Sequence, residues 1–248
     1  MNEYIYLSPH LDDVVLSCGA IIWDQVRRHE SVKIWTIFAG DPPQKEFSPF
    51  AREIHKRWNT GPEEAVSTRR AEDRLACERL QVIPLHLSYL DCIYRNSSGT
   101  AQPLIENNED LFQNLPDSEQ PLVDEIAQQL RQVLPAACTL VIPLAIGNHI
   151  DHQIVRRVGK ILKHSAYYYA DFPYSSNHPE EIHDRAPVNS PTYHFPLNNQ
   201  SLAVWQYAVE AYTSQLSSFW PSLNEMYEAV EAYAKSAIGN CLWQANND

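Results

Sequence analysis

Two short groups of side chains that can bind metal or transfer protons stand out in the sequence. The first is SPHLDD at residues 8–13, and the second is NHIDH at residues 148–152. Each follows an apolar run typical of a buried strand and precedes a run with helical spacing. Residues at the carboxyl ends of parallel strands meet at one edge of a sheet. We therefore expect the two groups to meet in space.

The residue types in these groups suit a catalytic zinc centre. Such a centre uses about three imidazole or carboxylate ligands and leaves one position open for water. His10, Asp13 and His152 would supply the ligands. Zinc makes its water acidic enough to attack near neutral pH. A site of two histidines and one carboxylate can also hold iron, cobalt or manganese, so the sequence leaves the metal open.

Three neighbouring residues would complete the chemistry. Asp12 is placed to take a proton from the attacking water and to hand it to a leaving amine. His149, about one turn from His152, is the candidate to stabilise the oxyanion formed from an amide carbonyl, and Asp151 would orient one of the imidazoles. Alternatively, Asp12 and Asp13 only cap the following helix, and the downstream histidines are solvated. The matched positions of the two groups favour catalysis.

These residues resemble the motifs of the LmbE-like or PIG-L deacetylase family, in which His-Pro-Asp-Asp is followed later by His-Pro-Asp-His. Members of that family are zinc-dependent hydrolases that remove acyl groups, usually acetyl, from N-acetylglucosamine-type sugars. The resemblance implies zinc ligands at His10, Asp13 and His152. It also implies a general base at Asp12 and an oxyanion-stabilising His149.

The resemblance extends over about residues 4–215 and implies two substrate-binding residues. Arg69 and Glu72 are similar to the family's Arg-x-x-Glu helix, whose arginine contacts substrate, and Asp91 stands where members tend to place an acidic residue. Alternatively, Arg69 pairs with a nearby carboxylate and Asp91 caps a turn. Leu11 and Ile150 replace the two motif prolines. These departures leave the metal chemistry intact but leave the identity of the substrate open.

The runs around the two groups predict an α/β fold. Strand-like apolar runs alternate with runs of helical spacing, which is typical of a mostly parallel sheet with helices on both faces. The expected fold is a Rossmann-like three-layer αβα sandwich. The predicted strands cover residues 4–7, 32–38, 84–87, 139–143 and 166–169, with an edge strand at 192–195.

Length and composition predict one domain over residues 1–248. A stretch at about 96–120, rich in Asn, Ser, Asp and Pro, indicates a loop insertion. A second loop is expected at 171–191, and a helical C-terminal extension at about 201–248. Long loops above a sheet often carry substrate contacts.

The net charge of −12 opposes attraction to nucleic acid and to anionic membrane surfaces. No apolar run approaches the roughly 18 to 20 residues of a membrane span, and the first residues lack signal-peptide features. The five cysteines form no C-x-x-C pair, which favours reduced thiols. We therefore expect a cytoplasmic protein without membrane association; a homo-oligomer stays an open alternative.

The sequence thus predicts a zinc-dependent N-deacetylase acting on an N-acetylglucosamine-type sugar or its conjugate, which is a small-molecule amino-sugar substrate. One alternative is a metal amidase or esterase on a non-sugar substrate. Another is a non-catalytic module that binds sugar or metal. The intact Asp12 favours an enzyme.

Overall fold

A seven-stranded mixed sheet forms the centre of the computed structural model, which describes residues 3–42, 47–61, 63–97 and 99–246. The strand order is β3-β2-β1-β4-β5-β7-β6. The first five run parallel: β3 (Ile83–His86), β2 (Ser31–Thr36), β1 (Glu3–Ser8), β4 (Cys138–Pro143) and β5 (Ser165–Tyr169). Antiparallel pairing adds β7 (Cys241–Gln244) and β6 (Thr192–His194) at one edge.

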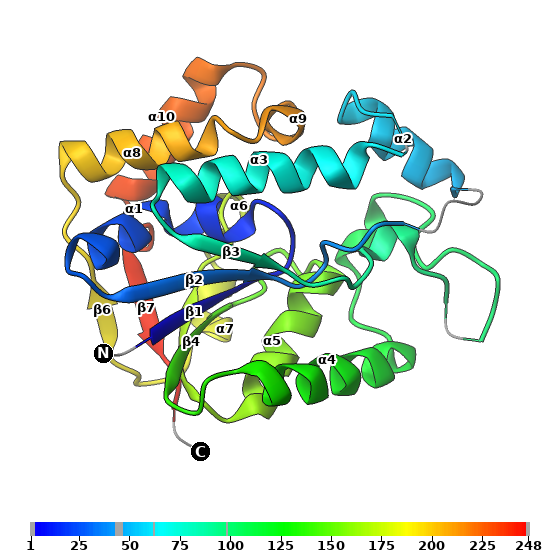
Figure 1. The fold of residues 1–248 in the computed structure, drawn as a ribbon, viewed down its shortest axis with the longest axis horizontal. Coiled ribbons are helices and arrows are strands. Elements are labelled where there is room, and N and C mark those ends of the chain that lie inside the picture. The colour runs from blue at the N-terminus through cyan, green and yellow to red at the C-terminus, as the bar shows by residue number, and fades with distance from the viewer. Residues whose placement is uncertain (1–2, 43–46, 62, 98, 247–248) are drawn as a thin grey trace.

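Helices cover both faces of the sheet (Figure 1). Against one face pack α1 (Asp13–Arg27), α3 (Ala65–Arg79), α8 (Asn199–Val209) and α10 (Leu223–Lys235). Against the other pack α4 (Gln120–Val133) and α5 (Ile150–Leu162). The three-layer αβα sandwich is therefore confirmed. No helix in the described part of the chain is both long and apolar enough to cross a membrane.

The central strands explain why the sheet forms where the sequence predicts it. Ile5, Tyr6 and Leu7 of β1 are fully buried, because helices cover both sides of the strand. A parallel strand covered on both faces is a nearly continuous apolar run. In the register, Tyr6 lies opposite Ile34 of β2 and Val141 of β4. Since β1 and β4 are neighbours, the segments that follow them leave the same edge of the sheet.

Four elements were not anticipated from the sequence. The expected irregular stretch after β2 contains α2 (Pro49–Arg57), which Ser48 caps by accepting a hydrogen bond from Ala51 N at 3.0 Å. The expected loop at 171–191 contains two short helices, α6 (Tyr174–Asn177) and α7 (Glu181–Arg185). The strand β7 was missed as well. It lies at the end of the stretch at about 201–248 for which we expected a helical extension.

The contact between α1 and α8 depends on a glycine. A Cβ atom at Gly19 would overlap the indole ring of Trp205, which is fully buried. The indole Nε1 donates to the carbonyl of Val15 at 2.8 Å, so the ring has no free direction in which to retreat. Gly19 is therefore a packing requirement of the helix crossing.

We expect Gly19→Ala to lower the free energy of unfolding by about 1 to 3 kcal/mol, the usual effect of overpacking a core. Helix propensity alone predicts the opposite sign, because alanine favours a helix over glycine by about 1 kcal/mol. Urea denaturation measures the difference. Gly61→Ala is the matched control, since a Cβ there meets no atom within 4 Å among the described residues. Equal stability of the two variants would contradict the packing argument.

Candidate metal centre and active site

The two predicted groups lie together at the carboxyl ends of β1 and β4. His10 is in the turn after β1, and Asp13 is the first residue of α1. His149 occupies the N-cap of α5, and His152 lies in the first turn of that helix. The hydroxyl of Ser8 holds the first turn closed by donating to the His10 carbonyl at 2.6 Å and accepting from a backbone N–H of α1 at 3.2 Å. The expected convergence is confirmed.

The turn that delivers His149 has an unusual backbone. Ala145, Gly147 and Asn148 have positive φ angles of 59°, 78° and 64°. Non-glycine residues adopt this conformation rarely, and such positions concentrate at functional sites. At Gly147 a Cβ atom would also lie 3.0 Å from Tyr174, so Tyr174 would have to shift to accommodate a side chain there. The backbone here is shaped to bring His149 over the end of β4.

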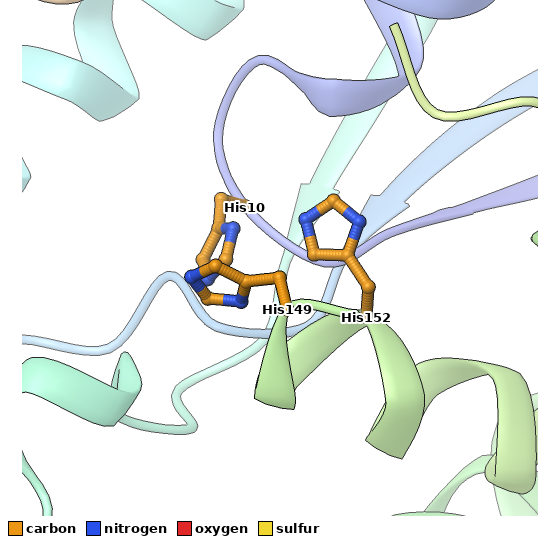
Figure 2. A group of neighbouring side chains, drawn as sticks. All are labelled: His10, His149 and His152. Carbon is orange, nitrogen blue, oxygen red and sulfur yellow. The ribbon is translucent and has the colours of Figure 1, made fainter. Parts of the chain in front are cut away.

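Three histidine side chains lie close together (Figure 2), and ring nitrogens of His10, His149 and His152 lie within 4.8 Å of one another. The Oδ2 atom of Asp13 lies 3.2 Å from His10 Nδ1 and 3.3 Å from His152 Nε2. His152 Nε2 is buried and makes no hydrogen bond with any described residue. Two imidazole nitrogens and one carboxylate oxygen that face each other in this way fit a divalent metal ion.

Other sets of donors lie close by. His149 could replace Asp13 in a three-histidine set, and Asp151 lies within reach of His10 and of Cys92. Asp151 is already engaged, because it pairs with Arg95 Nη2 at 2.7 Å and accepts from the Cys92 backbone at 3.0 Å. Burial raises the pKa of the Cys92 thiol well above its usual value, so the thiolate is disfavoured. The predicted set of His10, Asp13 and His152 therefore stays a prediction, and the two Asp13 distances are compatible with it.

Carboxylates hold the far nitrogens of two of the rings. His10 Nε2 lies 3.0 Å from Asp151 Oδ2, the geometry that the predicted orienting role requires. His152 Nδ1 lies 2.7 Å from Asp171 Oδ1, while Asp171 Oδ2 accepts from Ile146 N at 2.9 Å. Such contacts fix the ring orientation and raise the basicity of a metal ligand. Asp171 was missed, although its position directly after a predicted strand matches that of the two groups.

The buried carboxylates shape the proton affinities of the site. Burial lowers the pKa of His152, but Asp13 and Asp171 outweigh it and raise that pKa to about 9. Burial also lowers the pKa of His10, but Asp91, Asp13 and Asp151 outweigh burial and raise that pKa well above its usual value. Both rings therefore attract positive charge. A metal ion would replace these protons, since metal ligands bind in their deprotonated forms.

Asp12 is not a helix cap. It occupies the N-cap position of α1, yet its side chain accepts no capping hydrogen bond among the described residues. Instead it is buried beside Arg69, with Nη2 3.6 Å from its Oδ1. Burial and the adjacent Asp13 raise the pKa of Asp12 to about 6, while Arg69 lowers it. A buried carboxylate next to Asp13 and free of a capping role is compatible with the predicted role in proton transfer.

Arg69 and Asp91 lie in the same buried network. Arg69 Nη1 lies 3.6 Å from Asp91 Oδ2, and its guanidinium carbon lies 4.5 Å from the ring centroid of Trp58. Asp91 also caps a 3₁₀ turn at Cys92–Tyr94 by accepting from the backbone N–H of Ile93 at 3.1 Å. Both alternatives raised from the sequence therefore hold in part, because Arg69 pairs with carboxylates and Asp91 caps a turn.

Glu72, three residues after Arg69 on α3, has partners in the C-terminal part of the chain. It accepts from the backbone and the hydroxyl of Ser214 at 2.8 and 2.6 Å, and from the hydroxyl of Thr213 at 2.7 Å. These bonds hold α9 (Thr213–Leu216) against α3. Glu72 therefore holds α9 against α3 and is not the carboxylate that pairs with Arg69.

Two aromatic residues near the site were missed. Trp58 follows α2 and stacks on Arg69, and Phe112 lies in the expected insertion at 96–120. The Phe112 ring is 38% exposed and lies edge-on to His149, with ring centroids 5.6 Å apart. Neither residue belongs to a local pattern, so the sequence offered no signal for them. Phe112 brings apolar surface beside His149, and Trp58 brings it beside Arg69.

Comparison with known proteins agrees with this geometry. The family model PIG-L, described as GlcNAc-PI de-N-acetylase, matches residues 5–162. The 2'-N-acetylparomamine deacetylase of Niallia circulans is 31% identical over 203 residues, which cover 74% of this chain and 71% of that protein. The zinc-inhibited form of teicoplanin deacetylase Orf2 is similar over 100% of both chains, with a TM-score of 0.82 and 26% identity. The A40926 pseudoaglycone deacetylase Dbv21 gives 0.70 and 25%, over 98% of this chain and 96% of its own.

We expect Asp171→Asn to weaken zinc binding about 10- to 100-fold, because the neutral amide orients and polarises His152 less well. Competition with a chromophoric chelator measures the affinity without any activity assay. Asp184→Asn on the exposed side of α7 is the control and should bind zinc like the parent protein. Unchanged zinc affinity in Asp171→Asn would exclude the orienting role.

Proposed function

Since the chain belongs to the PIG-L family, we propose that it is a metal-dependent N-deacetylase that removes an acetyl group from an N-acetylglucosamine-type sugar carried on a larger conjugate. One observation carries the proposal. The buried imidazoles of His10 and His152 converge on one Asp13 oxygen at 3.2 and 3.3 Å, directly beside Asp12. This arrangement supports hydrolysis of an amide.

His10, Asp13 and His152 would hold the metal, with zinc the ion that best suits two imidazoles and one carboxylate. When bound, zinc would polarise the acyl oxygen and make water acidic enough to react near neutral pH. Asp151 and Asp171 would keep the two rings in place, because each accepts from the far nitrogen of one ring. The protein thus supplies an oriented set of ligands.

Asp12 would move the proton. Its carboxylate would accept a proton from the attacking water and then give it to the amide nitrogen as the C–N bond breaks, which yields acetate and a free amine. Arg69, 3.6 Å away, fixes the position of the carboxylate. The burial of both groups keeps bulk water from this transfer.

His149 would stabilise the negative charge that develops on the acyl oxygen. Its Nδ1 atom accepts from the backbone N–H of Asp151 at 3.3 Å, so in the neutral ring the hydrogen resides on Nε2. An Nε2–H donor aimed at a developing oxyanion is worth about 3 to 4 kcal/mol in comparable sites. The N-cap position of His149 thereby selects the tautomer that the reaction needs.

The substrate class rests on the relatives and on the residues around the site. The three relatives act, by their names, on 2'-N-acetylparomamine, on teicoplanin and on the A40926 pseudoaglycone. We assign the sugar hydroxyls to Arg69 and Asp91, because Arg69 lies 3.6 Å from both Asp12 and Asp91 and so joins the two carboxylates next to the proposed base. Trp58 and Phe112 would contact apolar parts of the sugar or of its conjugate.

Asp12→Asn should lower the rate of acetate release from an N-acetylated amino sugar at least about 100-fold, because the amide cannot accept the proton. Zinc content should stay at the parent level, which separates proton transfer from metal binding. Asp124→Asn on the exposed face of α4 is the matched control and should be fully active. Full activity of Asp12→Asn would overturn the mechanism.

Removal of the metal should abolish activity, and zinc should restore it. The experiment is dialysis against a chelator, followed by measurement of bound metal and of acetate release from N-acetylglucosaminides and from acylated amines without a sugar. Sugar substrates should be preferred at least about tenfold, since the predicted hydrogen bonds to hydroxyls add discrimination. A preference for the non-sugar amines would instead identify a general metal amidase.

A further inference from the structure

A cavity lies along the C-terminal half of α5. It has a volume of about 710 Å³ and is bounded by α5, by β5 and by the segment 185–188. Its apolar wall includes Ile142, Ala166 and Tyr168. Cavities of roughly 300 to 1,000 Å³ are typical of sites for small molecules. The size and the mixed lining suit a ligand that is partly apolar.

The polar wall of this cavity is positively charged. It is formed by Arg156, Lys160, Lys163 and Arg185, together with His164. No carboxylate belongs to the described residues that line it. This is unexpected in a chain with 31 acidic residues, 19 Lys and Arg, and a net charge of −12. A dense group of cations without acids requires an explanation.

Three of these cations have no carboxylate partner. Arg185 is paired with Glu181, with Nε 2.8 Å from Oε2. Arg156, Lys160 and Lys163 form no ion pair within the described parts of the chain. Burial and the charge of Arg156 lower the pKa of Lys160, as expected for like charges that no anion offsets.

Arg156 is held in a fixed position. Its Nη1 donates to the carbonyl of Leu144 at 2.9 Å, and its Nη2 donates to the carbonyl of Arg185 at 2.6 Å. Its guanidinium carbon lies 5.7 Å from the ring centroid of Tyr168. Its Nε atom is buried without a hydrogen-bond partner among the described residues. Carbonyl dipoles orient the guanidinium, and Asp171 acts on its charge without forming an ion pair with it among the described contacts.

We propose that this cavity binds a phosphate group, either free or as the monoester of a small molecule. Arginine and lysine are the side chains that bind phosphate most often, arginine through a planar set of donors and lysine as a mobile point charge. Three unpaired cations would offset the two negative charges of a phosphate monoester. The apolar wall formed by Ile142, Ala166 and Tyr168 would then face a sugar or a base.

A simpler explanation accounts for only part of the group. Lys160 and Lys163 lie at the C-terminal end of α5, where cations favour the helix dipole without any ligand. Arg156 lies in the middle of the helix, so the dipole does not explain it. The lysines are also remote from the metal, because the 11 residues from His152 to Lys163 span about 16 Å of helix. The two lysines are therefore separate from the residues assigned to the deacetylation proposed above.

Isothermal titration calorimetry of the zinc-loaded protein at constant ionic strength tests the site. The probes are inorganic phosphate, glucosamine 6-phosphate and adenosine monophosphate, with glucosamine and adenosine as uncharged references. We expect saturable binding of at least one phosphate probe with a Kd below about 1 mM. Lys160→Glu with Lys163→Glu should weaken it at least about tenfold. The control Arg27→Glu with Arg74→Glu, which makes the same charge change at exposed sites elsewhere, should alter it less than about twofold.

The outcomes separate the ligand sources. Tighter binding of the organic phosphates than of inorganic phosphate supports the site and shows that the apolar wall contributes. Equal binding supports the site with the phosphate group alone as its ligand. Binding that survives in Lys160→Glu with Lys163→Glu would place the anion at the metal centre and overturn the proposal. An equal loss in the control, or no saturation by any probe, would overturn it as well.

Discussion

The buried carboxylate of Asp13 is the constraint on which the rest of the site depends. A charge removed from water is strongly unfavourable unless it is paired, and Asp13 meets this requirement by facing two imidazole nitrogens. The residues around Asp13 also carry an excess of negative charge. Buried carboxylates here outnumber the guanidiniums of Arg69 and Arg95; they are Asp12, Asp13, Asp91, Asp151 and Asp171. A divalent cation would offset this excess of buried negative charge, so its binding would stabilise the folded site.

The sheet brings the residues of the site to one place. Because β1 and β4 are parallel neighbours, the turns that follow them open at the same edge. Each turn leads into a helix, and the first turns of these helices contain Asp13 and His152. This much was predictable from sequence, since it needs only the alternation of buried strands with helices and the position of polar residues after each strand. No exact register was required. His10 and His152 converge because of topology, and topology follows from local patterns.

The parts that escaped prediction depend on contacts between distant segments. β7 has four residues and forms only by pairing with β5 and β6, so its local sequence carries no signal of its own. Trp58 is recognisable as part of the site only because it stacks on Arg69 from another helix. Asp171 is intermediate, because the rule that singled out the first two groups also applies to it. Its partner, His152, could be identified only from the fold.

The helix α5 joins two regions of opposite charge. Its N-terminal end presents His149 and His152 to a site rich in buried carboxylates, and its C-terminal end presents lysines to a basic cavity. Arg156 lines the cavity and also contacts the segment that leads to His149, because it donates to the Leu144 carbonyl. Arg185 makes a similar link by donating to Asn148 at 3.0 Å. The arginines are thus structural supports of the catalytic turn as well as parts of the cavity wall. Only the lysines belong to the cavity alone, so they are the residues whose charge can report on anion binding without disturbing the turn that positions His149.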